Sequence, residues 1–217
     1  KDAGTVLLGK LAMHEYALGG PDWTTGFEPA RNPWNLDHIT GGSSSGSGSA
    51  VAAGQAMGAM GSCTGGSIRG PASLCGIVGL KATYGRVSRA GVVTLSWSQD
   101  HCGPMTWTVE DTAYMLQALA GHDPKDPTTS TAPVPDYSLS LREDVKGLTI
   151  GVPRHFFFDP HPSVNAEVVA AVEKGLTALQ DLGANLGDVT IPSLDQVRAA
   201  NIVIMLSEAF AFHEKNL

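Results

Sequence analysis

Two Gly/Ser-rich stretches constrain the fold of this chain more than any other feature: TGGSSSGSGSA at residues 40–50 and GSCTGGSIRGPAS at residues 61–73. Such a composition alone is typical of a flexible linker. The run between them, SAVAAGQAMGAM at residues 49–60, is small and apolar, which predicts a buried helix packed through glycine and alanine. A solvated linker would not lead into such a helix. We therefore expect two loops that fold back into contact at one end of it.

Elsewhere strands alternate with helices, which predicts an α/β fold with a largely buried sheet. Strands are expected at residues 5–8, 77–80, 148–152 and 188–191. Further helices are expected at residues 12–18, from near Ser67, and at 109–121, 163–182 and 194–215. The helix at 163–182 is expected to end at Gly183 and to turn one apolar stripe inward, made of Val164, Val168, Val172, Leu176 and Leu179.

The composition and a few local patterns exclude several classes of protein. The 217 residues are 42% hydrophobic, enough for one globular domain, and the net charge of −7 without a Lys/Arg run argues against a nucleic-acid surface. No apolar run is long enough to cross a membrane, and the N-terminal residues lack a signal-peptide layout. Three cysteines without a CxxC pattern favour a reducing, cytoplasmic setting. His14-Glu15 has no second histidine four residues after His14, so the HExxH zinc pattern is excluded.

Three chemistries compete for the Gly/Ser-rich stretches. A phosphate loop is disfavoured because Gly46-Ser47-Gly48 lacks the third glycine of GxGxxG, and no lysine stands at the Walker position. A GxSxG nucleophile elbow fails because Ile68-Arg69 follow Ser67. What remains is a serine nucleophile with unusual partners, beside backbone N–H groups at the start of a helix that could converge on an anion.

Long motifs then identify a resemblance. The segments NPWNLDHITGGSSSGSGSAVAAG (32–54), CTGGSIRGPASLCGIVGLKATYGRVSRAGVV (63–93) and DHCGPMTWTVEDTAYML (100–116) resemble the amidase signature family, whose enzymes use a Ser–cis-Ser–Lys triad. The resemblance runs nearly end to end. It implies an α/β/α sandwich around a mixed central sheet. Residues 1–217 would be the N-terminal and central portion of a single domain, because family members are about twice as long.

The resemblance also assigns the site. Ser67 matches the nucleophile, and Ser43 matches the bridging serine, which is preceded by a cis peptide bond; their separation, 67 − 43 = 24, agrees with the family. Arg69 would support the glycine-rich loop or contact substrate. The oxyanion hole is expected from the backbone N–H groups of Thr64, Gly65, Gly66 and Ser67.

The implied function is hydrolysis of a carboxamide to a carboxylate and ammonia or an amine, through an acyl-enzyme on a serine. No metal or organic cofactor is implied. The substrate would be a small-molecule amide, and a homodimer is left open. An alternative within the family is the A subunit of a tRNA-dependent amidotransferase, which releases ammonia from glutamine and would connect the chain to nucleic acid through its partners. A second alternative is an inactive piece with a structural or binding role.

The chain also departs from the family pattern. The triad lysine is expected upstream of the cis-serine, but Lys10 matches a different family lysine, and Lys1 is too close, at 43 − 1 = 42 residues before Ser43. We therefore expect residues 1–217 to lack both the segment with the catalytic lysine and the C-terminal half of the domain, and to hydrolyse little or nothing alone. Cys63 stands where an acidic residue is common, and Ala82 replaces a common proline.

Other candidates are interpreted structurally. His101 and Cys102, beside Asp100, are expected in a packed loop rather than as ligands or nucleophiles. Cys75 is expected to be a small buried hydrophobe. Adjacent Glu110 and Asp111 are expected to begin a helix, where the helix dipole favours acids.

Overall fold

A computed structural model describes residues 3–20, 27–142, 144–158 and 164–215 of the protein. The chain forms two compact units. One comprises Lys1–Leu141 together with Val203–Leu217, and the other comprises Arg142–Ile202. Both contain helices and strands, so the predicted α/β class is confirmed.

The first unit contains a three-stranded antiparallel sheet. Its central strand is β3 (His101–Thr106), which pairs with β1 (Gly58–Cys63) along its whole length and with the short β2 (Val78–Gly79). All of β3 except His101 is buried, although no strand was predicted there, whereas β1 is buried at alternate residues and β2 is half-buried. The prediction of a largely buried sheet is therefore confirmed for the central strand only. The register places Cys63 opposite His101, so the chain leaves β1 next to the start of β3.

The predicted helix at 49–60 is wrong in its bounds. Helix α1 covers Ser45–Ala52, so it begins within the first Gly/Ser-rich stretch. It ends before Gly54, whose φ of +71° is left-handed, and residues 58–63 form β1 instead. A run of small residues suits either a close-packed helix or a close-packed strand, and here pairing with β3 decides for the strand.

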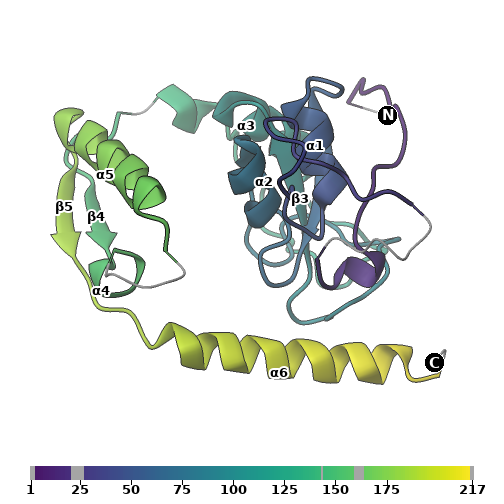
Figure 1. Ribbon diagram of the computed structural model, residues 1–217. Helices are drawn as coiled ribbons and strands as arrows, with labels where there is room; N and C mark the ends of the chain where they lie inside the picture. Colours follow the sequence, from purple (N-terminus) through teal and green to yellow (C-terminus); the bar gives the residue numbers. More distant parts are fainter. Residues whose placement is uncertain (1–2, 21–26, 143, 159–163, 216–217) are drawn as a thin grey trace. The chain divides into compact units, whose positions relative to one another are not determined.

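Two further helices pack against this sheet, as Figure 1 shows. Helix α2 (Arg69–Cys75) begins just after Ser67, as predicted, and ends at Gly76, whose φ of +68° is left-handed. Helix α3 (Val109–Leu119) matches the prediction for 109–121 and begins with a capping box between Thr108 and Asp111. The adjacent acids Glu110 and Asp111 therefore lie in its first turn, as expected.

The core consists of two small clusters of buried side chains. Ile68 and Met105 are both fully buried in the first, which holds α2 against the sheet and also contains Cys63 and Ala72. The second lies between the sheet and α3 and comprises Ala82, Val87, Cys102 and Leu116. Cys75 is fully buried, as predicted.

The N-terminal segment has less regular structure than expected. The predicted helix at 12–18 is only a 3-10 turn, η1 (Glu15–Ala17), and the predicted strand at 5–8 forms no ladder. Another 3-10 turn, η2, covers Leu139–Arg142. Leu7 is 83% exposed, so this apolar run has nothing to pair with among the described residues.

The second unit contains a parallel two-stranded sheet of β4 (Thr149–Val152) and β5 (Asn185–Asp188). Strand β5 therefore lies earlier in the sequence than the strand predicted at 188–191. Helices α4 (Arg154–Phe157) and α5 (Ala166–Asp181) connect the two strands.

The structure confirms the predicted end of helix α5, but not the prediction that its whole apolar stripe is buried. Gly183 follows it with a left-handed φ of +95°. Val168 and Val172 are 59% and 46% exposed, so they do not face inward, while Leu176 and Leu179 are half-buried. A two-stranded sheet is too small to cover the whole apolar stripe.

The last helix is α6 (Leu194–His213), close to the prediction for 194–215. Glu208 on α6 accepts hydrogen bonds from the Ser96 hydroxyl and from the Ser98 N–H, the latter at 3.1 Å. His213 Nε2 lies 2.8 Å from the carbonyl oxygen of Thr94. The loop before β3 is therefore fixed by the end of α6.

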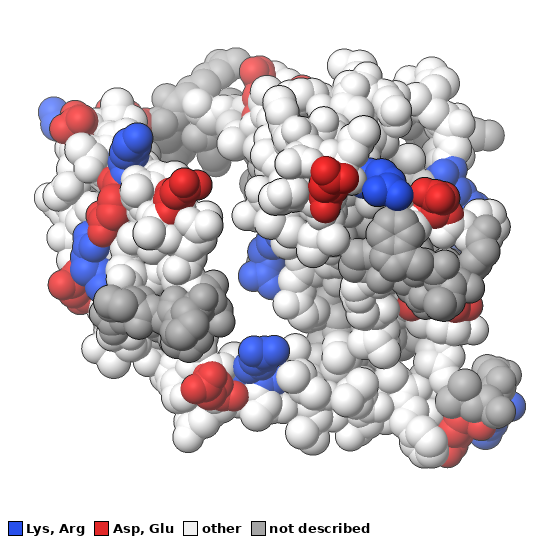
Figure 2. Space-filling view, viewed as in Figure 1, with Lys and Arg blue, Asp and Glu red and all other residues white. Residues whose placement is uncertain are grey.

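Charged side chains are dispersed over the face shown in Figure 2, with acidic and basic residues interspersed rather than gathered into a basic surface. None of the helices in the described residues has the length and apolar character to span a bilayer.

Candidate functional site

The two serine-bearing turns lie side by side. The Ser44 N–H donates to the carbonyl oxygen of Ser67 over 3.3 Å, which joins the turn before α1 to the turn before α2. The peptide bond between Gly42 and Ser43 is cis, as predicted. The loops are brought together by α1 and the returning strand β1, rather than by a single helix.

The serines of the first turn differ in their contacts. Four of them bond to backbone and so fix α1 in place. Ser44 Oγ contacts both the carbonyl and the N–H of Ser62, at 3.2 and 3.1 Å. The others bond the carbonyl oxygens of Ala12, Met60 and Arg31, from Ser45, Ser47 and Ser49 respectively.

Ser43 is the exception. It is 1% exposed, yet its Oγ has no hydrogen-bond partner among the described residues. The turns of Ser43 and Ser67 are therefore joined through their backbones, but the two hydroxyls are not hydrogen-bonded to each other. A buried hydroxyl without a partner costs free energy, so its retention points to a functional group rather than a structural one.

The N-terminal segment closes the other side of the Ser43 turn. The Gly46 N–H donates to the carbonyl oxygen of Ala12 over 2.8 Å, and the His14 N–H donates to that of Ser43 over 3.0 Å. The approach is close: a Cβ on Gly46 would lie 2.6 Å from the Ala12 nitrogen. Glycine is needed at this point of the Gly/Ser-rich stretch because two backbones touch there.

The second turn presents free backbone donors. In the described part of the chain, the N–H groups of Thr64, Gly65, Gly66 and Ser67 donate no backbone hydrogen bond. Gly66 has a φ of +142°, a conformation that other residues rarely adopt. Ile68, fully buried, anchors the turn in the core directly after Ser67. Such a turn can offer several N–H groups to one oxyanion.

Asp100 fixes this turn from behind, a role that sequence analysis missed. Its Oδ1 accepts a hydrogen bond of 2.6 Å from the Thr64 hydroxyl. Its Oδ2 accepts the N–H groups of Leu95 and Ser96, at 2.9 and 3.0 Å. Asp100 stands at the start of the third motif, residues 100–116, but nothing in the sequence indicates that it contacts Thr64.

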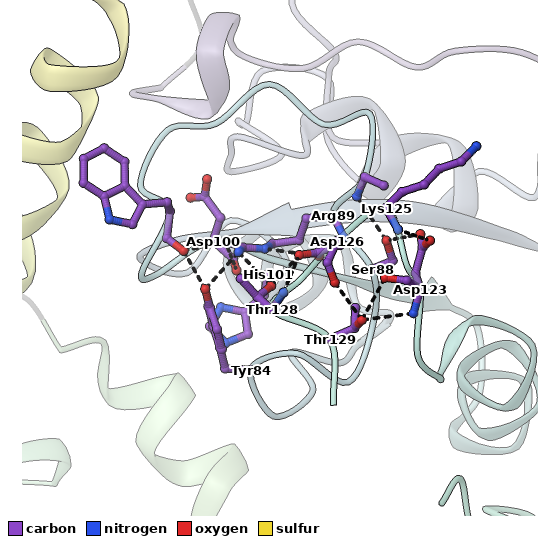
Figure 3. Close-up of polar contacts among 12 residues, drawn as sticks. Tyr84, Ser88, Arg89, Asp100, His101, Asp123, Lys125, Asp126, Thr128 and Thr129 are labelled. Atoms are coloured by element: carbon purple, nitrogen blue, oxygen red, sulfur yellow. Dashed lines mark hydrogen bonds and ion pairs between the residues drawn. The ribbon is translucent and has the colours of Figure 1, made fainter. Parts of the chain in front are cut away.

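Arg89 organises the neighbouring loops, as Figure 3 shows. Its guanidinium donates to the carbonyl oxygen of Trp97 at 2.7 Å, to Tyr84 Oη at 2.8 Å and to Thr128 Oγ1 at 2.9 Å. Its Nε lies 3.8 Å from Asp126. Burial opposes the charge on Asp126, but hydrogen bonds from Thr128 and Arg89 together hold the pKa of that carboxyl below its ordinary value.

His101 and Cys102 belong to this packed region. They lie at the start of β3 rather than in a loop, which corrects the prediction, and both are packed. Burial lowers the pKa of His101, and the nearby ammonium of Lys81, 3.2 Å from Nε2, acts in the same direction. Burial raises the pKa of Cys102 to about 11. The raised pKa keeps the Cys102 thiol protonated near neutral pH, and contacts with Gln99 and Lys81 occupy both ring nitrogens of His101, so neither side chain is free to act as a nucleophile or base.

A small pocket of about 150 Å³ lies beside Asp100. Ser62 and Thr64 line it, together with Arg89, Thr94 and Asp126. Because Arg89 and Asp126 are paired with each other, their opposite charges largely cancel within the lining.

Two more residues that were singled out in the sequence make no contact that indicates a role. Arg69 is exposed at the start of α2, and its side chain has no partner among the described residues. Cys63 is fully buried in the core. The described residues contain no group of three histidine, cysteine or acidic side chains that could hold a metal ion.

Comparison with known proteins identifies the family of the chain. The family model described as Amidase matches residues 1–217. The glutamyl-tRNA(Gln) amidotransferase A subunit from Trichlorobacter lovleyi is 49% identical over 209 residues, which cover 96% of this chain and 42% of that protein.

Two solved structures are also similar. The glutamyl-tRNA(Gln) amidotransferase A subunit of Thermotoga maritima has a TM-score of 0.89 at 41% identity, over 95% of this chain and 45% of that one. The peptide amidase of Stenotrophomonas maltophilia has a TM-score of 0.83 at 36% identity, over 99% of this chain and 45% of that one. The chain thus spans less than half the length of these relatives. It belongs to the amidase signature family.

Proposed function

We propose that the protein takes part in amide hydrolysis, with Ser67 as the nucleophile and Ser43 as the bridging serine. One observation carries the proposal: the turn of Ser43, with its buried unpartnered hydroxyl, is hydrogen-bonded to the turn of Ser67. Membership in the amidase signature family supports the same assignment.

The first step forms the acyl-enzyme. Ser67 Oγ attacks the carbonyl carbon of the amide, and its proton passes to Ser43 Oγ. The hydroxyl proton of Ser43 passes at the same time to a neutral primary amine, which the family resemblance assigns to a lysine. The carbonyl oxygen becomes an oxyanion, which the free N–H groups from Thr64 to Ser67 would stabilise. One such donor lowers the barrier by about 3 kcal/mol.

The intermediate then collapses. The ammonium returns its proton through Ser43 to the amide nitrogen, the C–N bond breaks, and ammonia or an amine leaves. Water repeats the sequence on the ester: it gives its proton to the relay, attacks the acyl carbon, and releases a carboxylic acid while Ser67 regains its hydrogen. No metal or organic cofactor is required by this scheme.

A second candidate is favoured by the names of the relatives. Both the Trichlorobacter protein and the Thermotoga structure are A subunits of glutamyl-tRNA(Gln) amidotransferase. In that case the amide would be glutamine, the released ammonia would serve a transamidation, and the protein would work with partner subunits. The same residues would act in the same roles.

The test uses the longest natural form of the protein and a fluorophosphonate probe. We expect the probe to label Ser67, and Ser67→Ala to abolish labelling. Ser43→Ala should slow labelling by about 100-fold or more, the usual contribution of proton transfer. Ser49→Ala, which removes only the bond to Arg31, is the matched control and should be labelled at the normal rate.

Labelling that survives Ser67→Ala would reject the nucleophile, and a wild-type protein that is never labelled would favour an inactive structural piece. Ammonia release from glutamine, compared with release from a panel of simple amides, separates the two candidate functions.

A further inference from the structure

A histidine outside the expected site lies against the cis peptide. His14 is only 6% exposed, and its ring packs over Gly42: a Cβ on that glycine would lie 2.1 Å from Cε1 and 2.3 Å from Nδ1 of His14. The backbone of His14 is also bound to Ser43, through the N–H bond of 3.0 Å. Ring and backbone thus hold both residues of the cis peptide.

The contacts of the ring define its tautomer. His14 Nδ1 lies 2.8 Å from the carbonyl oxygen of Gly19. A carbonyl oxygen only accepts hydrogen bonds, so Nδ1 carries the hydrogen. In the neutral imidazole, Nε2 is therefore a lone-pair acceptor.

Nε2 has no hydrogen-bond partner among the described residues, and neither has Ser43 Oγ. These are the two buried side-chain N or O atoms that lack a partner in the described part of the chain. Both adjoin Gly42: Nε2 would lie 3.2 Å from a Cβ on that glycine, and Ser43 is the residue after it. Buried polar atoms are normally paired. One partner that donates to an imidazole and also accepts from a hydroxyl could serve both.

We propose that His14 is a positioning residue that orients the amine of the proton relay. A neutral primary amine has two N–H donors and one lone pair. One N–H would bond to His14 Nε2, which would turn the lone pair toward the Ser43 hydroxyl. A single amine then satisfies both unpaired atoms. The inference rests on the proposed function, because that function supplies the amine.

The arrangement also favours the direction of proton transfer. When the amine takes the proton of Ser43, it becomes an ammonium with three N–H donors. One continues to bond to Nε2, and another points back to Ser43 Oγ, ready to return the proton. A hydrogen bond with a charged donor is stronger than one with a neutral donor, so Nε2 stabilises the charged state that forms during acylation.

Two substitutions separate this role from a merely structural one. His14→Asn keeps a donor at the position of Nδ1, and hence the bond to Gly19, but removes Nε2. His14→Gln places its amide oxygen near the position of Nε2 and loses the donor to Gly19. The experiment uses the longest natural form of the protein and measures the rate of Ser67 labelling by the fluorophosphonate probe, kcat and KM, and the melting temperature.

We expect His14→Asn to slow labelling and lower kcat by roughly 10- to 100-fold with KM nearly unchanged, the effect of one hydrogen bond to a charged group. His14→Gln should recover most of the rate despite losing the Gly19 bond. The opposite order, with the Asn variant fast and the Gln variant slow at equal melting temperatures, would show that only the structural bond matters and would overturn the proposal.

The same experiment keeps the two hypotheses apart. If wild-type protein is not labelled, the proposed function fails. If it is labelled but His14→Asn reacts at the wild-type rate, only the role of His14 fails. Nitrogen-15 NMR of the imidazole adds a measurement that needs no activity: we expect the hydrogen on Nδ1, and a ring protonated on Nε2 alone would exclude the acceptor role.

Discussion

The hydroxyl of Thr64 donates a hydrogen bond of 2.6 Å to Oδ1 of Asp100, which ties the turn that carries Ser67 to a carboxylate 36 residues away in sequence. The other oxygen of Asp100 accepts two backbone N–H groups. Replacing Asp100 with alanine would leave the Thr64 hydroxyl and the two buried N–H groups without their acceptor. We expect Asp100→Ala to lower the free energy of unfolding by about 2–4 kcal/mol, measured by denaturant titration.

Variants of Thr64 provide the control for that prediction. Thr64→Ser keeps the hydroxyl and should lose little stability. Thr64→Val removes one bond while Asp100 retains two, so the loss should be about 1 kcal/mol. A Thr64→Val loss as large as that of Asp100→Ala would mean that the bonds to Leu95 and Ser96 contribute nothing.

Position 46 requires glycine because another backbone segment packs against it, and not because of its φ angle. A Cβ there would lie 2.6 Å from the nitrogen and 2.7 Å from the oxygen of Ala12, and backbone atoms cannot rotate away. We expect Gly46→Ala to destabilise the protein by about 1–3 kcal/mol, as overpacking does. Gly175→Ala is the matched control: it lies in α5 with no atom within 4 Å of the added Cβ, so helix propensity should make it stabilising by about 0.5–1 kcal/mol. Equal effects of the two changes, measured by denaturant titration, would contradict the close approach of Ala12.

The fold was predictable where local signals were strong. The acids Glu110 and Asp111 in the first turn of α3, the glycine after α5 and the start of α2 near Ser67 were all predicted from the sequence, and the structure confirms them. The bounds of α1 were not. Small residues at 49–60 satisfy both a close-packed helix and a close-packed strand, and pairing with residues 101–106, far away in sequence, makes the choice.

The site was predictable only in part. The Gly/Ser-rich motifs located both serine turns, and the cis peptide was expected from the family resemblance. The positions of His14 and Asp100 were not predictable, because each depends on a contact with a loop distant in sequence. Single residues of this kind carry no periodicity or spacing that marks them before the chain is folded.

Titration of His101 should affect stability in mild acid. Its folded-state pKa is lowered, chiefly by burial, from an ordinary value of 6.5, so the unfolded chain takes up the proton first as the pH falls. The stability from the neutral ring is complete above about pH 6.5 and is lost as the pH falls through the folded-state pKa. We expect the loss of unfolding free energy between about pH 7.5 and pH 5 to be smaller in His101→Asn, whose amide can keep the bond to Gln99. An unchanged pH dependence in this variant would rule out His101 as a contributor.

The cysteines should resist modification in the native protein. Cys63 and Cys75 are fully buried and Cys102 is 6% exposed. The pKa of Cys102 is raised to about 11. At pH 8 only about one thousandth of it is therefore thiolate, the reactive form. We expect Ellman's reagent to titrate no thiol within minutes in native buffer and all three, the full count of the sequence, in guanidinium. Because Cys102 lies in the cluster between the sheet and α3, rapid reaction of this residue alone, identified by its loss in Cys102→Ala, would mean that α3 opens readily from the sheet.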